Sequence, residues 1–434
     1  MSASEVVEVE GHIIDSLILA KVLDVILDAG GDYRMVDVEI GRTNVDPSRA
    51  RLEVTAPDDE ALAVILEQLQ IHGANRVAQG DAEVQPADVD GVLPEGFYST
   101  TNLPTQVRMG GHWVDVDNPE MDCAIVVRPD GRVRTVPMHR VRAGDPVVVG
   151  RAGVRVQALE RPRGATPFEF MSSEVSSEKP KQQLVARVAE RIRAAKAAGG
   201  KVLAVCGPAV IHTGAGPDVA ALVRGGWVDV LFAGNGFPTH DIEANVLGTS
   251  LGVPLGDGVP PEGGHSNHLR VINEVRRRGS IAAAVADGYI TGGVMYECVQ
   301  HGVPFVLGGS VRDDGPLPDV YTDVVEAADA MRAELPGVSV ALMLASTLHA
   351  IATGNLLPAG VETYCVDINQ AVVTKLADRG SHQALGIVTD VGLFLSTLVH
   401  HLLRAGPPAG AGPAGAERRP LPGAPSGPAG GATR

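Results

Sequence analysis

The sequence predicts an α/β protein in which a parallel sheet forms the C-terminal domain, after an α+β domain and a small β domain. Three observations support this class. From residue 184 to about residue 405, continuous apolar strands alternate with helical stretches, a pattern typical of a parallel sheet covered on both faces. Residues 5–86 read as strand–helix–strand–strand–helix–strand, and residues 98–160 carry short alternating runs broken by turns.

Residues 1–97 contain the elements of a ferredoxin-like α+β domain in their usual order. "EVVEVE" is the first strand, and "DSLILAKVLDVILDAGG" is an amphipathic helix with Ser16 as its N-cap and Gly30–Gly31 as its stop. "YRMVDVEIG" and "ARLEVTA" alternate as half-buried strands do, "DDEALAVILEQLQIHG" is a second helix, and "ANRVAQ" is the last strand. Such modules bind small molecules or assemble subunits, and the sequence does not choose between these roles.

The remaining chain divides into four parts. Residues 98–171 form the small β domain, 172–183 are a polar linker, and 406–434 are a Gly/Pro/Ala-rich tail that we expect to be disordered. Residues 184–405 form the large α/β domain. Its predicted strands are "KVLAVC", "VDVLFAG", "SIAAAVA", "VPFVLGG", "VSVALMLA", "ETYCVD" and "LGIVTD".

Composition restricts the partners and the compartment. The formal net charge of −16 argues against nucleic acid and anionic membranes as partners, because both would repel the chain. No apolar run reaches the length of a membrane span, and the acidic N-terminus lacks the apolar core of a signal peptide. The four cysteines are scattered without a CxxC pair, which suits a reducing compartment. We therefore expect a cytoplasmic protein.

The stretch "FAGNGFPTHDIEANVLGTSLG" joins a buried strand to a helix and is rich in polar groups. Ligands of open parallel sheets bind beyond the carboxyl ends of the strands, and glycines with a helix N-terminus there favour an anion. Asn235 lies between two glycines of the turn, and the added His240, Asp241 and Asn245 exceed what a tight turn before a capped helix would need, although that simpler interpretation stays open.

A second strand–helix junction has the spacing of a nucleotide-binding unit. "VALMLASTLHAIATGN" places Ser346 and Thr347 at the junction and His349 just inside the helix. The next strand ends at Asp367, 20 residues after Thr347, where an acidic residue usually binds an adenosine ribose. The alternative is that Ser346 only caps the helix and Asp367 is a solvated strand end.

Three further strand ends are expected on the same edge. One carries Thr389 and Asp390, another carries the "SVRDDG" loop with Asp313 and Asp314, and a third carries Asp287. A surface turn is the alternative for the paired aspartates Asp313 and Asp314. Metal binding is not expected, because nothing near His265 and His268 completes a tetrahedral ligand set.

Several long motifs resemble those of the archaeal-type NAD-dependent ornithine cyclodeaminase family. They are "EVEGHIIDSLILAKVLD", "FAGNGFPTHDIEANVLGTSLG", "ADGYITGGVMYECV", "GGSVRDDGPLPDVYTDVVEA", "STLHAIATGNLLP" and "CVDINQAVVTKLADRGS", and the resemblance covers roughly residues 5–403. This family shares a region with lysine-ketoglutarate reductase/saccharopine dehydrogenase and is related to the C-terminal part of cyanobacterial arginine dihydrolase/ornithine cyclodeaminase fusions. The arginine dihydrolase module has no counterpart here, so we expect no arginine hydrolysis.

The resemblance implies a Rossmann-like NAD-binding domain similar to that of deoxyhypusine synthase, and conversion of L-ornithine to L-proline and ammonia with NAD recycled in each turnover. The sequence departs from the pattern of the family at Pro238, where we expect a small residue. The NAD contacts that it implies fall on Asn235, Gly236, Asp314, Ser346, Thr347, Leu348, His349, Asp367, Asp390 and Val391.

Catalytic roles follow from the chemistry of such a reaction. Hydride loss from Cα needs a neutral α-amine and therefore a general base, for which His240 and Asp241 are candidates. Asp287 or Asp313 could hold the δ-ammonium group. The small-molecule partner is then an amino acid, and the ferredoxin-like domain suggests a homodimer or homotetramer.

Two other functions compete with this one. A transferase of the deoxyhypusine synthase kind would need an imine-forming lysine, but Lys21 and Lys375 lie in helical stretches. A regulatory protein that senses NAD and an amino acid is the other alternative. Formation of proline from ornithine would decide between these functions.

Overall fold

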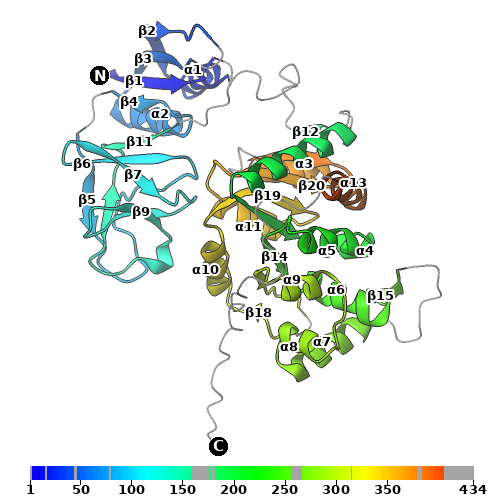
Figure 1. Ribbon diagram of the computed structural model, residues 1–434. Helices are drawn as coiled ribbons and strands as arrows, with labels where there is room; N and C mark the ends of the chain where they lie inside the picture. The colour runs from blue at the N-terminus through cyan, green and yellow to red at the C-terminus, as the bar shows by residue number, and fades with distance from the viewer. Residues whose placement is uncertain are drawn as a thin grey trace, which may run out of the picture. The chain divides into compact units, whose positions relative to one another are not determined.

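The computed structural model describes residues 2–14, 17–43, 46–77, 80–157, 175–176, 181–255, 266–313, 315–378 and 384–404. The chain divides into two compact units, residues 1–172 with 355–360 and residues 173–354 with 361–434 (Figure 1). The predicted N-cap Ser16, Asp314, most of the predicted linker and the tail 406–434 lie outside the described residues.

The N-terminal part of the first unit has the predicted ferredoxin-like order. β1 (Ala3–Gly11), α1 (Ile18–Asp28), β2 (Asp32–Glu39), β3 (Ser48–Ala56), α2 (Asp59–Ile71) and β4 (Asn75–Arg76) follow one another. The strands form an antiparallel sheet in the order β2-β3-β1-β4. Alternate residues of β3 are buried, so one face of the sheet packs on a core of Val, Leu and Ile side chains.

A seven-stranded sheet forms the rest of this unit. Its strands are β5 (Glu83–Pro86), β6 (Thr105–Met109), β7 (His112–Asp117), β8 (Ala124–Val127), β9 (Val133–Val136), β10 (Pro146–Val149) and β11 (Val154–Val156), with the short helix η1 (Met138–Arg140) after β9. The sheet order is β11-β6-β7-β9-β8-β10-β5, so β5, which precedes residue 98, already belongs to this sheet. Residues 355–360 also belong to this unit: Asn102 Nδ2 donates to the carbonyl of Leu357.

The second unit contains the predicted parallel sheet. β12 (Val175–Ser176), β13 (Lys201–Cys206), β14 (Val230–Gly234), β17 (Phe305–Gly308), β18 (Val320–Tyr321), β19 (Val338–Leu344), β20 (Glu362–Asp367) and β21 (Ala384–Val388) are all parallel to their neighbours. Their order is β12-β21-β20-β19-β13-β14-β17-β18. After β13, the strands β14, β17 and β18 are added in turn on one side of it. The strands β19, β20 and β21 are added in turn on the other side. The carboxyl ends of β13 and β19 therefore mark a topological switch point, where ligands of such sheets bind.

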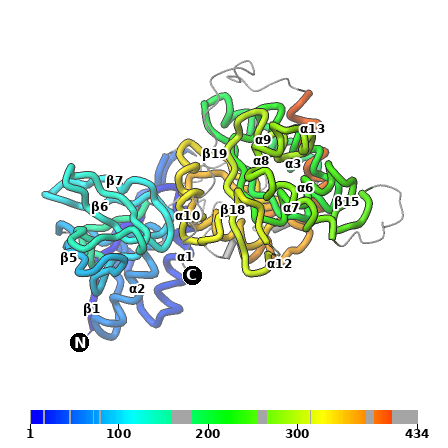
Figure 2. Tube along the Cα trace, turned by 90° about the horizontal axis from the view of Figure 1, so that it is seen from below, coloured from blue at the N-terminus to red at the C-terminus, as the bar shows by residue number. Residues whose placement is uncertain are grey.

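Helices cover this sheet, and the strands are apolar and buried because both faces are covered. The helices are α3 (Lys181–Ala197), α4 (Ala209–His212), α5 (Gly216–Arg224), α6 (Gly236–Leu247), α7 (Asn267–Arg278), α8 (Ile281–Ala286), α9 (Val294–His301), α10 (Val324–Glu334), α11 (Leu348–Leu356), α12 (Gln370–Asp378) and α13 (Val391–Leu403). Helices α6 to α9 lie together in both views (Figure 1, Figure 2), and a small hairpin of β15 (Thr249–Ser250) and β16 (Val253–Pro254) follows α6.

One predicted strand is wrong. "SIAAAVA" forms α8, because Ser280 caps a helix there by accepting a hydrogen bond from the Ala283 N–H, and alanine is the best helix former. A short apolar run cannot be assigned to strand or helix by periodicity alone. Asp287 consequently lies at the C-terminal end of a helix and not at the end of a strand. The other six predicted strands of this domain are confirmed.

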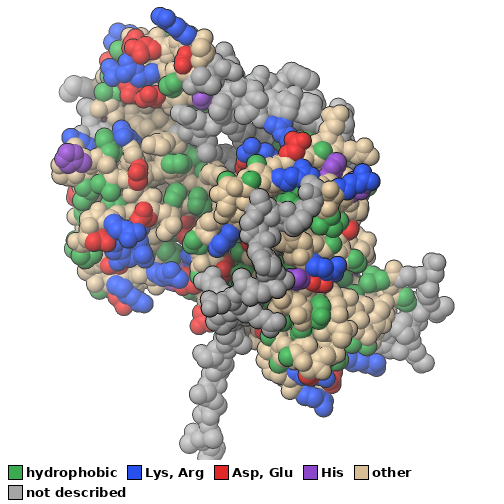
Figure 3. Space-filling view, in the orientation of Figure 1, with side chains coloured by type: hydrophobic (Ala, Val, Ile, Leu, Met, Phe, Trp, Pro, Cys, Tyr) green, Lys and Arg blue, Asp and Glu red, His purple; other side chains and the backbone are tan. Residues whose placement is uncertain are grey.

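The surface carries both signs of charge. On the face shown in Figure 3, basic and acidic side chains lie close to one another over both units. Among the described residues, none of the helices combines the length and apolar character required to cross a bilayer.

Candidate active site at the carboxyl edge of the parallel sheet

The loops after β13 and β19 touch at the switch point. A Cβ atom on Gly207 would lie 1.8 Å from the carbonyl oxygen of Ala345, so only glycine permits this approach. Ala345 itself has a positive φ of 47°, an uncommon conformation for a residue with a side chain. The backbone conformation is therefore closely constrained just before α11, at Ser346 and Thr347.

The imidazole of His349 lies over the ends of two strands. A Cβ atom on Gly234 would be 2.8 Å from His349 Cε1, and one on Gly308 would be 3.1 Å from His349 Nε2. Burial lowers the pKa of His349, and the charge of nearby Asp313 opposes this shift. Asp313 accepts a hydrogen bond from the Ser310 N–H at 2.8 Å, which fixes the "SVRD" turn beside the histidine. The structure thus brings three predicted loops, after β14, β17 and β19, to one place.

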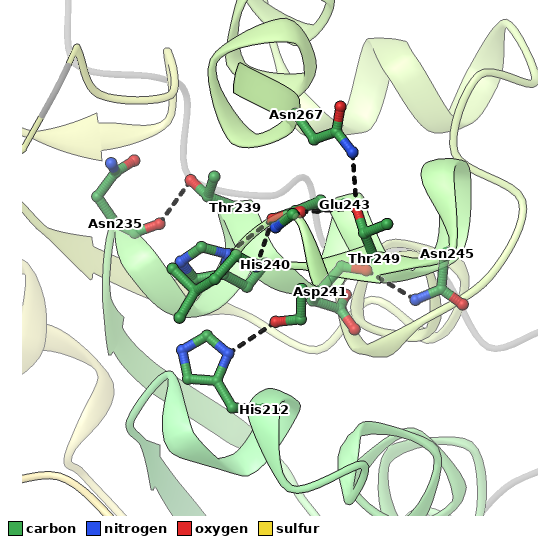
Figure 4. A network of polar contacts seen from close by, with 12 residues as sticks. His212, Asn235, Thr239, His240, Asp241, Glu243, Asn245, Thr249 and Asn267 are labelled. Atoms are coloured by element: carbon green, nitrogen blue, oxygen red, sulfur yellow. Dashed lines mark hydrogen bonds and ion pairs between the residues drawn. The ribbon is translucent and has the colours of Figure 1, made fainter. Parts of the chain in front are cut away.

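Asn235 follows β14 and has one donor available for a ligand. Its Oδ1 accepts from the Leu317 N–H at 3.0 Å, and its carbonyl accepts from Thr239 Oγ1 at 2.8 Å (Figure 4). Within the described part of the chain, its side-chain Nδ2 donates no hydrogen bond. The buried amide therefore has a structural acceptor and an unused donor at the start of α6.

Asp241 has a structural role. It is 1% exposed, and its two oxygens accept from the backbone N–H groups of Val294 and Met295, each at 2.9 Å. It therefore caps the N-terminus of α9 from a neighbouring helix. Burial raises the pKa of Asp241 to about 6 despite these two bonds. Gly293 has a φ of 95°, and a Cβ atom there would lie 2.8 Å from the Asp241 carboxylate.

His240 faces a buried carboxylate that the sequence analysis did not single out. Its Nδ1 lies 2.9 Å from Glu243 Oε2, one turn further along α6 (Figure 4). The His212 ring of α4 meets the His240 ring edge-on at 4.8 Å between centroids, and His212 Nδ1 lies 2.7 Å from Ser250 Oγ. The spacing of three between His240 and Glu243 on a predicted helix is a signal that could have revealed this pair.

The β19–α11–β20 segment is a parallel unit with the predicted nucleotide-binding spacing. Ser346 is buried and Leu348 is 76% exposed at the first turn of α11. Asp367 ends β20, and its carbonyl accepts from the Thr389 N–H at the end of β21, 3.1 Å away. Asp390 caps α13 through a hydrogen bond from the Leu393 N–H, and Val391 opens that helix as a buried side chain.

Other candidates lie away from this edge. Asp287 pairs with Arg278 Nε at 2.6 Å. Lys375, one of the two lysines weighed for an imine, lies in α12. Among the described residues, no group of three or more His, Cys, Asp or Glu side chains could hold a metal ion.

The residues at this edge fit a dinucleotide. Glycines 207, 234 and 308 let other groups approach the backbone closely, and the N-termini of α6 and α11 supply N–H groups suited to phosphate oxygens. Asp367 ends the strand where a ribose is usually bound, and Asn235 Nδ2 donates no hydrogen bond to the described residues.

Fold and site together define a nucleotide-binding Rossmann-type domain. Residues 186–398 match the family model described as "Arginine dihydrolase ArgZ-like, C-terminal, Rossmann fold". Residues 4–103 match the "LOR/SDH bifunctional enzyme conserved region", and residues 104–185 match "Arginine dihydrolase ArgZ-like, C-terminal, first region".

The chain belongs to the ornithine cyclodeaminase family, as the resemblance of its motifs predicted. It is 54% identical over 402 residues to the ornithine cyclodeaminase of Methanopyrus kandleri, with 92% of this chain and 97% of the relative covered. The apo structure of the cyanobacterial arginine dihydrolase ArgZ superposes with a TM-score of 0.81 at 39% identity, over 93% of this chain and 59% of that one. A ternary complex of AgrE with ornithine and NAD+ matches at 43% identity and a TM-score of 0.51, over 93% of this chain and 58% of that one.

Proposed function

We propose that this protein is an ornithine cyclodeaminase that converts L-ornithine to L-proline and ammonia with NAD as its cofactor. The observation that carries the proposal is the convergence of the loops after β14, β17 and β19 on one edge of the sheet. The imidazole of His349 lies over the ends of β14 and β17, and Asn235 opens α6 after β14. Asp367 ends β20, the neighbour of β19 on the same edge of the sheet. Ornithine cyclodeaminases at up to 54% identity, and the AgrE complex with ornithine and NAD+, support the substrate and the cofactor.

Bound NAD would accept a hydride from Cα of ornithine and return it to the same carbon after the ring has closed. The residues proposed to hold it are Asn235, Gly236, Asp314, Ser346, Thr347, Leu348, His349, Asp367, Asp390 and Val391, of which Asp314 lies outside the described residues. The helix N-termini would meet the phosphates and Asp367 the ribose hydroxyls. A carboxylate there disfavours a 2′-phosphate, which predicts NAD over NADP.

His240 is the proposed general base. It would take a proton from the α-ammonium group so that the nitrogen lone pair can assist hydride loss, and it would return that proton to the ammonia that leaves. Of the two predicted bases, His240 fits better, because both oxygens of Asp241 are occupied by the α9 backbone.

Asp313 is the proposed partner of the δ-ammonium group. A Cβ atom on Gly308 would lie 3.1 Å from His349 Nε2, and one on the next residue, Gly309, would lie 3.6 Å from Asp313 Oδ2, so this carboxylate belongs to the same edge as His349. Asp287, the other candidate, is paired with Arg278. Asp313→Asn should therefore raise KM for ornithine more than Asp287→Asn does.

Turnover with labelled substrate tests the function. With a small amount of NAD and ornithine carrying ¹⁵N at the α-nitrogen, we expect one unlabelled proline and one ¹⁵N-ammonia per ornithine, because the δ-nitrogen stays in the ring. Tight NAD binding without proline would point to an NAD-responsive regulatory protein instead. Label retained in proline would show that the δ-nitrogen leaves.

The proposal also covers the cellular compartment and the oligomeric state. All four cysteines are free and buried, as suits a reducing cytoplasm. A homodimer or homotetramer is the proposed assembly, and light scattering after size-exclusion chromatography measures it directly.

A further inference from the structure

We infer that Glu243 is a positioning residue for catalysis: it fixes the tautomer of His240 so that Nε2 is the nitrogen that takes the substrate proton. This inference rests on the proposed function, because it assigns a role within the same reaction. It concerns a side chain that contacts His240 and not the substrate.

The hydrogen bonds of Glu243 account for both of its oxygens. Its side chain is 0% exposed, Oε1 accepts from Thr249 Oγ1 and from the Gly252 N–H, each at 2.8 Å, and Oε2 lies 2.9 Å from His240 Nδ1 (Figure 4). The Leu251 N–H reaches Oε2 at 3.3 Å. Burial alone would raise the pKa of Glu243, but the bonds from His240, Gly252 and Thr249 outweigh burial and lower it. The buried side chain is therefore a carboxylate surrounded by donors.

A carboxylate only accepts hydrogen bonds, which determines the protonation of its partner. His240 Nδ1 must carry a hydrogen to donate to Oε2, so the lone pair of the neutral ring is on Nε2. When Nε2 takes a proton from the α-ammonium group, the resulting imidazolium stays paired with Glu243. The proton then passes to the departing ammonia, and the ring returns to its starting tautomer.

Two other histidines lie near His240, and His212 has a partner different from that of His240. His212 on α4 lies 4.8 Å from the His240 ring, and His268 on α7 lies 6.3 Å from it, both measured between centroids. Burial, and then the charge of His240, lower the pKa of His212. Its Nδ1 meets the neutral hydroxyl of Ser250 at 2.7 Å, whereas the Glu243 carboxylate is bonded to His240. The Glu243 carboxylate therefore orients the His240 ring, and His212 has a neutral partner.

Glu243→Gln tests the inference while keeping the volume of the side chain. The glutamine oxygen can still accept from Thr249 and Gly252, but its NH2 group then faces His240 Nδ1 and makes that nitrogen the acceptor. Nε2 becomes protonated and is no longer a base. We expect kcat to fall about 10²–10⁴-fold, the range of general acid–base catalysis, with the NAD dissociation constant within about 3-fold of wild type. Glu243→Asp, which keeps an accepting carboxylate, should recover part of the rate.

Thr249→Val is the matched control, because it removes one donor from Oε1 and leaves the bond to His240. We expect a less stable protein with kcat within about 3-fold of wild type. Equal losses of kcat in Thr249→Val and Glu243→Gln would overturn the inference and make Glu243 an anchor of the β15–β16 hairpin only. Unchanged kcat in a folded Glu243→Gln protein would overturn it as well.

A spectroscopic measurement on the wild-type protein does not depend on the variants folding. In ¹⁵N-histidine-labelled protein, with His240 assigned by its absence in His240→Gln, the neutral ring should show a protonated Nδ1 and a bare Nε2. The opposite tautomer contradicts the inference. Failure of the wild type to form proline would instead contradict the proposed function, and this tautomer would still report whether Glu243 orients the ring.

Discussion

Replacing Asn235 in two ways should separate its structural role from its role in binding. Its Oδ1 accepts from the Leu317 N–H at 3.0 Å in a buried environment, whereas its Nδ2 donates to none of the residues that the structure describes. Asn235→Ala removes both atoms and leaves the Leu317 N–H without its partner. Asn235→Asp keeps an oxygen for Leu317 and replaces only the free donor.

The magnitudes follow from these contacts. An orphaned buried N–H costs about 1–3 kcal/mol, so Asn235→Ala should lower the free energy of unfolding by that amount and Asn235→Asp by much less. Loss of a neutral hydrogen bond of about 0.5–1.5 kcal/mol should raise the NAD dissociation constant of Asn235→Ala about 2- to 13-fold. Asn235→Asp should weaken NAD binding further, because its carboxylate repels the pyrophosphate.

Urea denaturation and calorimetric titration with NAD measure the two effects on the same proteins. The predicted pattern is a stability defect in Asn235→Ala and the larger binding defect in Asn235→Asp. If Asn235→Asp bound NAD like the wild type, the free amide would not contact the cofactor, and the loop after β14 would serve only to hold Leu317.

Three further variants test other parts of the account. Asp367→Ala should weaken NAD binding by about 1.5–3 kcal/mol and reduce the difference in affinity between NAD and NADP, as competitive titrations would show. Equal wild-type affinities for the two cofactors would mean that another residue binds the ribose. Gly293→Ala should lower the free energy of unfolding by about 1–3 kcal/mol, because φ is 95° and the new Cβ would lie 2.4 Å from Asn245 Nδ2, and an unchanged urea midpoint would contradict this. The raised pKa of Asp241 means that the folded state binds a proton more tightly than the unfolded state, so its contribution to stability is present below pH 3.8 and is lost as pH rises to about 6. This loss is on the order of 3 kcal/mol, and Asp241→Asn should abolish this part of the pH dependence of unfolding.

The fold was predictable where patterns are long and consistent. Strand β19 is buried at every position except Ser339, and all its other residues are apolar, which is the pattern of a parallel sheet covered on both faces. The strand prediction for Ile281–Ala286 was wrong because four alanines with one isoleucine and one valine suit a buried helix as well as a strand. The hydrogen bond by which Ser280 caps the helix decides between the two, and only the structure shows it.

The candidate site was predictable only in part. Polar residues at strand ends point to an edge of the sheet, which is how Asn235, His349 and Asp367 were found. Residues that contact the site from distant parts of the chain leave no pattern in the sequence near the site. Leu317 fixes Asn235 across 82 positions, and His212 meets His240 from a different strand–helix junction.

Deuterium at Cα of ornithine provides the most direct test of the central claim, that one edge of this sheet removes a hydride from the substrate and returns it within the same turnover. The protein is incubated with Cα-deuterated L-ornithine and a small amount of NAD, and the proline is analysed by mass spectrometry and NMR. We predict proline that retains deuterium at Cα, with no accumulation of reduced cofactor. Proline with hydrogen in place of deuterium at Cα, or NAD reduced in proportion to the ornithine consumed, would contradict the claim.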